Sequence, residues 1–311
     1  MFLKTRVIVN PESNKGRTKR RWKEIKEALK AFIKEFKYEF TERPFQAIEL
    51  SRRAIKEGTD LIVGVGGDGT INEIANGFYE NEKIINPKTV LAIIPSGSGC
   101  DFIRSLNIPL SLKKALKVIT QAPSSWIDIG KVKFKNHQGK ERERLFLNVA
   151  DFGIGGEVVK KVNENKLKRK ASSYFRCLLS TFLAYKNRRV RLRIDGREFP
   201  SDEYLIGTIS NGRIFGRGMK IAPQAKLDDG LFDVVLIKGM KALEFFRNVW
   251  RIYTGSHLSH HKISWVRGKR IEAYPEEGEK EVLIELDGEQ LGRLPAVFEI
   301  VNRSLLVKGY F

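Results

Sequence analysis

The chain has 311 residues, of which 41% are hydrophobic and 30% are charged, a composition typical of soluble globular proteins. It is long enough for two domains. Lys and Arg exceed Asp and Glu by 57 to 37, and the resulting net charge of +20 predicts an anionic partner or substrate: nucleic acid, acidic lipid headgroups or nucleotide phosphate. Two cysteines, Cys100 and Cys177, indicate a reducing compartment without a disulfide framework. The start of the chain predicts a strand rather than a signal peptide, and no apolar stretch reaches the roughly 20 residues that a membrane-spanning helix needs.

The first part of the chain alternates short apolar runs with amphipathic stretches, which predicts strands and helices in turn. Strands are predicted at 6–10, 38–41, 61–65 and 89–94, and helices at 22–36, 45–56, about 70–76 and 112–120. This alternation predicts a mostly parallel sheet, in which ligands bind beyond the carboxyl ends of the strands. We therefore expect one cleft to be shared by the strand ends at Asn10, Thr41, Gly66–Thr70 and Pro95–Ser98.

Residues 61–76, LIVGVGGDGTINEIAN, predict a strand, a tight glycine loop and a helix. We expect the glycines to turn with positive φ and to let a bulky anion approach, with Asp68 as the loop side chain that can act chemically. Thr70 is predicted to cap the helix, whose N-terminus favours phosphate. The pattern GxGxxG also fits a dinucleotide fold, but no acidic residue follows at about 20 positions. A purely structural turn would not need an aspartate among four glycines.

Beyond a short linker at 122–125 the pattern changes to many strands and few helices, which argues for an antiparallel sandwich or barrel. The predicted strands are 126–132, 145–150, 190–194, 204–210, 231–237, 262–266, 282–286 and 296–301. Two helices are predicted to interrupt them, at 172–185 and 243–253.

Several motifs in a fixed order carry a resemblance to a known family. They are NP at 10–11, GGDGTINE at 66–73, PSGSGCDF at 95–102, IDIG at 127–130, DDGLFD at 228–233 and LDGE at 286–289. The set resembles the diacylglycerol kinase catalytic-domain family, in particular its soluble bacterial lipid kinase branch, over nearly the full length. GGDGT alone is shared with NAD kinases and is similar to a phosphofructokinase motif. The second loop departs from the family's usual GTxND, because Cys100 replaces the amide residue.

The resemblance implies a fold and a division of the chain. Residues 1–124 would form a three-layer α/β nucleotide-binding domain of the NAD kinase and phosphofructokinase kind. Residues 125–303 would form an antiparallel β-sandwich that holds the lipid, with a cleft between the domains. The segment 304–311 would return to the first domain.

The implied activity is ATP-dependent transfer of a γ-phosphate to a lipid hydroxyl, as in phospholipid biosynthesis. Phosphoryl transfer needs positioning and charge neutralisation more than covalent chemistry. Asp68 would hold Mg²⁺ between phosphates, besides contacting the nucleotide. The expected ATP-binding residues are Asn10, Pro11, Ser13, Lys15, Thr41, Gly66, Gly67, Asp68, Gly69, Thr70, Asn72, Glu73 and Ser98.

The LDGE turn matches the family's proton acceptor at Glu289, with Asp287 beside it, and the sequence leaves open which carboxylate is the base. Asp-Gly is also the commonest hairpin signal. The resemblance further implies a structural Mg²⁺ bound by Asp229 and by the carbonyl groups of Lys226 and Leu231. A zinc site at His257, His260 and His261 is disfavoured, because no cysteine or carboxylate completes the set at suitable spacing.

The basic run Lys166–Lys170, followed by the apolar helix at 172–185, predicts docking on an anionic membrane surface. A core helix beside a solvated charge run explains the same pattern. We expect a cytoplasmic protein bound peripherally to the inner face of the membrane, with a homodimer as an option. NAD kinase activity and nucleic-acid binding are the alternatives, and the first lacks its second-domain motif. The second lacks an aromatic or helical reader. The identity of the lipid is left open.

Overall fold

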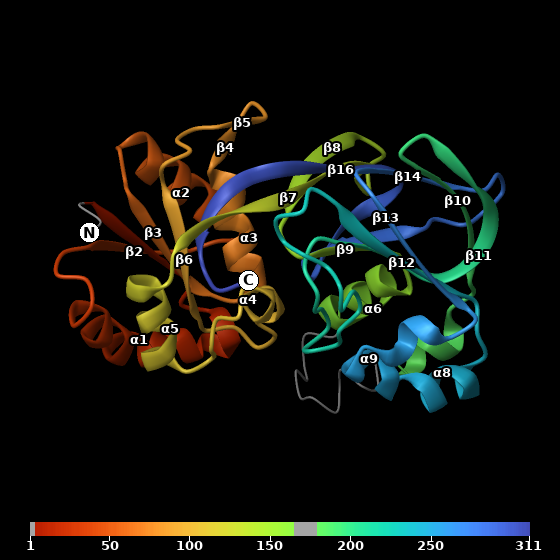
Figure 1. Cartoon of the computed structure of the whole chain (residues 1–311), viewed down its shortest axis with the longest axis horizontal. Coiled ribbons are helices and arrows are strands. Elements are labelled where there is room, and N and C mark those ends of the chain that lie inside the picture. The colour runs from red at the N-terminus through yellow and green to blue at the C-terminus, as the bar shows by residue number, and fades with distance from the viewer. Residues whose placement is uncertain (1–3, 165–178) are drawn as a thin grey trace. The chain divides into compact units, whose positions relative to one another are not determined.

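The computed structural model describes residues 4–164 and 179–311, which divide into two compact units (Figure 1). Unit 1 contains Met1–Ile129, Lys226–Gly230 and Val301–Phe311, and unit 2 contains Gly130–Ala225 and Leu231–Ile300. The segment Lys226–Gly230, which we expected in the second domain, therefore groups with unit 1. The basic run at 166–170 lies outside the described residues. No helix in the described ranges is long and apolar enough to cross a membrane.

Unit 1 is built around a parallel sheet in the order β2-β1-β3-β6. The strands are β1 (Thr5–Val9), β2 (Lys37–Phe40), β3 (Leu61–Gly66) and β6 (Val90–Pro95). The end of β16 (Glu289–Lys308) continues the sheet beside β6, where Val307 pairs in parallel with Leu91. β3 and β6 are buried along almost their whole length, as expected for parallel strands covered on both faces.

Helices cover the two faces of this sheet and confirm the predicted three-layer α/β fold (Figure 1). Leu29 of α1 (Ser13–Lys30) and Leu116 of α5 (Leu112–Gln121) share a core with alternate residues of β1, β3 and β6. On the other face, Ile71 of α3 (Asp68–Gly77) packs against Gly64, and α2 (Gln46–Lys56) packs against α3. Short elements follow: β4 (Tyr79–Glu80), β5 (Lys83–Ile84) and α4 (Asp101–Ser105). α1 ends before the predicted limit at 36.

Unit 2 is an antiparallel β-sandwich, as predicted. Its strands are the later part of β7 (Ser124–Lys135), β8 (Glu141–Phe146), β9 (Val149–Gly153), β10 (Arg188–Ile194), β11 (Arg197–Ser210), β12 (Phe232–Lys238), β13 (Ile263–Gly268), β14 (Arg270–Pro275), β15 (Leu283–Leu286) and the first part of β16. β11 pairs with β10 along its first half and with β9 along its second half, while β16 pairs with β14 and β15. Each of these two long strands thus changes its pairing partner along its length. The sequence did not predict β14 as a separate strand.

Helical segments cover one side of unit 2. They are α6 (Ile154–Glu164), residues 179–184, α8 (Ala242–Asn248), α9 (Trp250–Thr254) and the 3₁₀ turn Ser256–Ser259. The ring of Phe182 stacks on that of Phe245 with centroids 4.4 Å apart, so residues 179–184 pack on α8. The single helix predicted at 243–253 is two short helices. α6 was not predicted.

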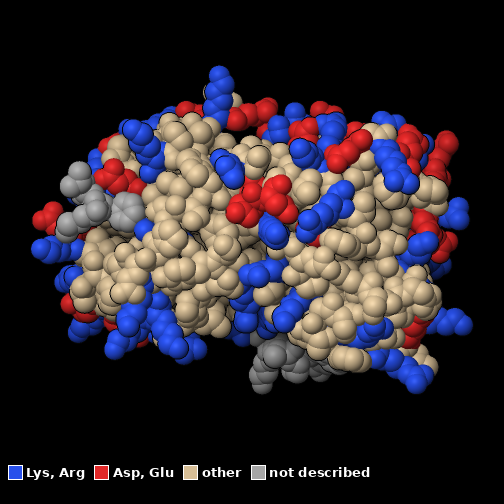
Figure 2. All heavy atoms as spheres, viewed as in Figure 1, with Lys and Arg blue, Asp and Glu red and all other residues tan. Residues whose placement is uncertain are grey.

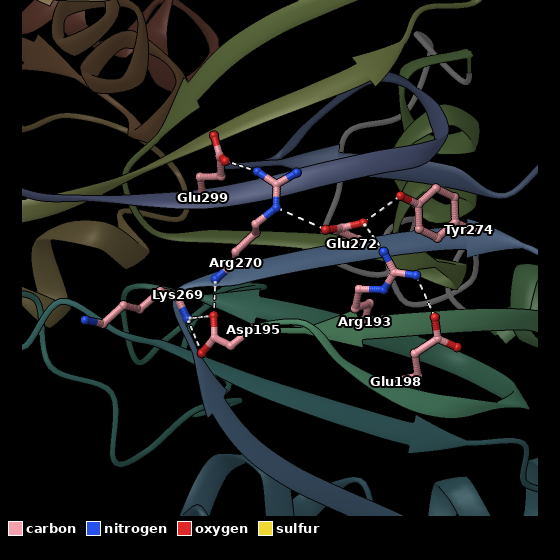
Figure 3. Close-up of polar contacts among 8 residues, drawn as sticks. All are labelled: Arg193, Asp195, Glu198, Lys269, Arg270, Glu272, Tyr274 and Glu299. Carbon is pink, nitrogen blue, oxygen red and sulfur yellow. Dashed lines mark hydrogen bonds and ion pairs between the residues drawn. The ribbon is translucent and has the colours of Figure 1, made fainter.

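The outer faces of β10, β14 and β16 carry a chain of ion pairs (Figure 3). Glu272 accepts from Arg270 at 3.0 Å and from the Tyr274 hydroxyl at 2.7 Å, and it lies 3.7 Å from Arg193. Arg193 also donates to Glu198 at 2.6 Å. Several Lys and Arg side chains of this basic protein are therefore neutralised locally, and Figure 2 shows Asp and Glu interspersed among the basic side chains.

Candidate active site

The glycine loop of unit 1 ends β3 at Gly66 and begins α3 at Asp68, with Gly67 as the N-cap residue. No side chain caps α3, so its first N–H groups and positive dipole end are suited to an anion. The prediction that Thr70 caps this helix is wrong, because the helix starts two residues earlier. Thr70 is buried in the first turn, and its hydroxyl accepts a hydrogen bond from Asn10 Nδ2 at 2.9 Å.

Close packing, not positive φ, explains the glycines of this loop. Gly64, Gly66 and Gly67 all lie outside the left-handed region, contrary to the expectation from sequence, and Gly69 lies within α3. A Cβ atom on Gly97 would stand 2.4 Å from the Cα atom of Gly67. The glycine loop and the loop after β6 therefore touch backbone to backbone.

The turn after β1 forms a third side of this region. Asn14, Lys15 and Gly16 follow Ser13 with φ values of 52°, 59° and 72°, a left-handed run that costs about 1–3 kcal/mol for each non-glycine residue. The Ser13 hydroxyl donates to the Ser96 carbonyl oxygen at 3.1 Å, which ties this turn to the loop after β6. Strain of this kind is typical of functional loops. Lys15 is exposed on it.

The residues before this turn anchor it to the sheet and to α1. The Asn10 N–H group donates to the Val65 carbonyl oxygen at 3.0 Å. The Pro11 carbonyl oxygen accepts from the Lys19 N–H group at 3.1 Å. Asn10 thus contacts the glycine loop through both its backbone and its side chain.

Asp68 joins the glycine loop to α4. Its two carboxylate oxygens accept from the N–H groups of Asp101 and Phe102, each at 3.1 Å, and so cap that helix. Burial raises the pKa of Asp68, against these hydrogen bonds. Burial and the charge of Asp68 raise the pKa of the Cys100 thiol to about 12. Ser98 stands exposed at the tip of the same loop.

Three other residues that were predicted to bind the nucleotide, Thr41, Asn72 and Glu73, have backbone or side-chain partners outside the two glycine loops. Thr41 follows β2, is buried, and donates its N–H group to the Val9 carbonyl oxygen at 2.9 Å. The Glu73 carboxylate accepts from the Ala47 N–H group at 3.2 Å at the start of α2. Asn72 is buried and accepts from the Asn76 amide at 3.0 Å. Asn72 and Glu73 therefore have structural partners within unit 1, and their contact with a nucleotide stays a prediction.

In unit 2, the turn between β15 and β16 holds both predicted catalytic carboxylates. Asp287 has a left-handed φ of 47°. Its carboxylate accepts from the N–H groups of Leu147 at 2.7 Å, Asn148 at 3.0 Å and Val149 at 3.1 Å. Asp287 thus fastens the turn to the start of β9. A carboxylate used in this way is poorly placed to accept another proton.

Glu289 begins β16 on the other side of the turn, opposite Leu286. It is half-buried, and its carboxylate lies 4.0 Å from the guanidinium group of Arg144. A nearby cation favours the ionised form, which a general base requires.

The segment Lys226–Gly230 is held by Asp128, a residue of the IDIG motif for which no role was predicted from the sequence. The buried Asp128 carboxylate accepts from the N–H groups of Gly230 and Arg303, each at 2.6 Å. Burial, with smaller effects from the charges of Asp229 and Asp228, raises its pKa. An aspartate in an otherwise apolar strand was the signal available in the sequence. Negative charge at Asp128 and Asp229 suits a divalent cation, although the ligand set Lys226, Asp229 and Leu231 stays a prediction.

His260 and His261 belong to an ion-pair cluster with Glu244. Potential ligand atoms of Glu244, His260 and His261 lie within 4.8 Å of one another, so the structure supplies the carboxylate that the sequence analysis did not find. The ammonium group of Lys262 already pairs with Glu244 at 2.7 Å, and the Lys262 N–H group donates to His260 Nδ1 at 3.2 Å. These contacts favour a structural role.

A parallel sheet with a glycine loop at its carboxyl edge, followed by a β-sandwich with an acidic turn, defines a class of phosphotransferases, and comparisons with known proteins agree. Residues 4–132 match the diacylglycerol kinase catalytic domain, and residues 148–308 match the YegS C-terminal NAD kinase beta sandwich-like domain. A diacylglycerol kinase of Staphylococcus aureus (strain MRSA252) is 31% identical over 98% of this chain and 92% of that protein. One from Staphylococcus carnosus (strain TM300) is 29% identical over 96% and 92%. The chain belongs to the diacylglycerol kinase family.

Solved structures support the same fold. A putative diacylglycerol kinase from Bacillus anthracis str. Sterne is 26% identical over 99% of this chain and 96% of that one, with a TM-score of 0.77. An NAD kinase from Archaeoglobus fulgidus, in complex with ATP, is similar in fold alone, with 17% identity over 98% and 93% of the two chains and a TM-score of 0.51.

Proposed function

We propose that this kinase uses ATP and Mg²⁺ to phosphorylate the hydroxyl group of a diacylglycerol-like lipid. The observation that carries the proposal is the uncapped N-terminus of α3 between two glycine loops in backbone contact. Such a cradle suits a polyphosphate because it offers N–H donors without side-chain bulk. The NAD kinase of similar fold was crystallised with ATP.

The residues of unit 1 fit a nucleotide with a divalent cation. The first N–H groups of α3 and the exposed Lys15 would bind phosphate oxygens. Asp68 accepts the N–H groups of Asp101 and Phe102, and burial penalises its charge, so a cation beside it would stabilise the ionised carboxylate. Bound Mg²⁺ would neutralise charge on the phosphates. Thr41 and Ser98 would add hydroxyl contacts.

We assign the base to Glu289 and a positioning role to Asp287. The three N–H groups that donate to Asp287 hold the turn and occupy three of the roughly four lone-pair sites of its carboxylate. Glu289 would take the proton of the lipid hydroxyl as its oxygen forms the bond to the γ-phosphorus and ADP leaves. The sequence left the choice between Asp287 and Glu289 open, and these contacts favour Glu289 in this proposal.

The outer face of α8 and α9 supports action at a membrane surface. Leu243, Trp250 and Tyr253 are 70%, 59% and 50% exposed, and Arg247 stands between the first two at helical spacing. Exposed Trp and Tyr beside Arg are typical of segments that lie in the interface of an anionic bilayer. In Figure 2 this part of unit 2, at the lower right, is mostly uncharged with basic side chains beside it.

The test is transfer of labelled phosphate from ATP to a panel of acceptors in mixed micelles and anionic vesicles. The panel holds diacylglycerol, phosphatidylglycerol, a polyprenol, a sphingoid base and NAD⁺. We expect a lipid acceptor to be labelled, and label in NAD⁺ alone would overturn the proposal. Replacing Leu243 and Trp250 by Ser should weaken vesicle binding, whereas Leu110→Ser, at a site 54% exposed in unit 1, should not. Equal binding by both variants would remove α8 and α9 from the docking surface.

A further inference from the structure

Two carboxyl groups that no part of the proposed mechanism uses lie face to face in unit 2. Asp151 on β9 is the direct cross-strand partner of Glu285 on β15. Asp151 is fully buried and Glu285 is nearly so, and both carboxylate oxygens of Asp151 lack a hydrogen-bond partner among the described residues. Two ionised carboxylates at such a contact repel strongly, so the pair must hold a proton between them.

Asp151 has little room for any other arrangement. Its oxygens lie against Gly155 in the first turn of α6, where a Cβ atom would stand 2.3 Å from both of them. On its other side, across β11, it faces Thr208, which does not titrate. Burial, followed by the charge of Glu285, raises the pKa of Asp151 well above its ordinary value. The absence of a side chain at Gly155 therefore leaves the space that the Asp151 carboxyl group occupies.

Glu285 connects this pair to the candidate active site. Its carboxylate accepts from the N–H group of Gly288, inside the turn that carries Asp287 and Glu289. Gly288 has a left-handed φ of 91°, as expected for the glycine of a tight hairpin turn, and Glu285 is the acceptor for its N–H group. Asp287 fastens one end of the turn to β9, and Glu285 fastens its middle.

We propose that Asp151 is a positioning residue, which stays protonated and donates to Glu285 so that Glu285 holds the Gly288 turn and aims Glu289. This inference rests on the proposed role of Glu289 as the base. Asp151 does not touch the reacting atoms. Its proton fixes the direction of Glu285, and loss of that proton would push the two carboxylates apart and release the turn.

The sign of the pH dependence follows from the raised pKa. The pair stabilises the turn at low and neutral pH, and this contribution is lost as pH rises through the folded-state pKa of the pair. The Tyr185 hydroxyl also lies near the pair, because the charge of Asp151 affects its pKa. The charges of Arg188, Glu157 and Glu279 act on the same hydroxyl. The pKa of Tyr185 is itself raised, chiefly by burial.

The test compares Asp151→Asn with Asp151→Ala. Asn is neutral and keeps an N–H donor for Glu285, so it should retain most of kcat and lose the alkaline fall in the kcat profile that the wild type shows. Ala should lower kcat by about tenfold or more with KM for ATP unchanged, because a small displacement of a catalytic group is costly. Glu281→Gln, an exposed carboxylate that pairs with Arg293 just before β15, is the matched charge-deletion control and should follow the wild type.

Two readouts do not depend on kinase activity. The infrared band of a protonated carboxyl group should be present in the wild type at neutral pH and absent from Asp151→Asn. Amide exchange at Gly288 should be faster in Asp151→Ala than in Asp151→Asn, and if the Ala variant does not fold, Glu285→Gln serves in its place. A missing band, or a wild-type profile that overlays that of Asp151→Asn, would overturn the proposal. A kinase that is inactive on every lipid but keeps the band and the exchange pattern would instead contradict only the proposed function.

Discussion

The glycine loop of unit 1 and the acidic turn of unit 2 each contain an aspartate next to a glycine, and both aspartates accept backbone N–H groups. Asp68 caps α4, the short helix that follows β6, whereas Asp287 accepts from the N–H groups at the start of β9. An aspartate in a conspicuous motif can therefore serve mainly to hold the backbone of a neighbouring segment. What remains for chemistry then differs: backbone N–H donors in unit 1, and a neighbouring carboxylate, Glu289, in unit 2.

The largest loss of activity should follow replacement of Glu289, the carboxylate to which we assign the role of base. Glu289→Gln is expected to lower kcat by about 10²-fold or more, the usual range for loss of a general base, with ATP affinity little changed. Asp287→Asn should lower the melting temperature as well, because an amide oxygen cannot replace both carboxylate oxygens. Single-turnover kinetics and thermal unfolding of the two variants separate the roles. Loss of ATP binding in Glu289→Gln would assign it to the nucleotide site.

A second effect tests whether backbone contact builds the phosphate cradle. Gly97→Val places a side chain where a Cβ atom already meets the Gly67 backbone at 2.4 Å, so the loops must part. A displacement of about 1 Å can cost 10²-fold in rate, and we expect ATP binding to weaken along with it. Gly99→Ala, whose Cβ atom would meet the carboxylates of Asp68 at 3.3 Å and Asp101 at 3.6 Å and no backbone atom within 4 Å, should be milder. Isothermal titration measures the ATP affinity of each variant. Equal affinities would show that contact between the two loops is not needed for ATP binding.

Sequence reasoning predicted the layers of unit 1 and the sandwich of unit 2, because periodicity of apolar residues reports burial directly. It misjudged features that depend on contacts between distant segments. Gly67 looked like a positive-φ residue, but its partner is Gly97. Asp128 and Asp151 are single acidic residues in apolar strands, and their partners lie more than 100 positions away. α6 was hidden because its first turn holds two glycines, one of which makes room for Asp151.

A smaller effect concerns the stability that Asp68 gives to the loops. Asp68→Asn leaves one carbonyl oxygen for two N–H groups, so α4 loses one charge-assisted hydrogen bond, worth about 1.5–3 kcal/mol. Urea unfolding measures the loss, with Glu73→Gln, which keeps an acceptor for Ala47, as the control. Unchanged stability together with lost activity would make the carboxylate purely catalytic.

The smallest expected effect is on the pH dependence of stability, and it comes from His257, a buried residue of unit 2 to which we assign no part in the reaction. Its Nε2 atom donates to the Ile221 carbonyl oxygen at 2.9 Å, and burial lowers its pKa. Below about pH 6.5 the unfolded chain takes up a proton that the folded protein refuses, so the wild type should lose stability as pH falls, by at most about 1.4 kcal/mol per pH unit. His257→Gln keeps a donor for Ile221 without the titration, and its free energy of unfolding should vary less between pH 7 and pH 5. His261→Gln, at an exposed site, should follow the wild type. If all three proteins show the same slope, His257 does not set the loss of stability at low pH. Asp128 and Asp151 cannot cause that loss either, because their raised pKa values make stability rise as pH falls.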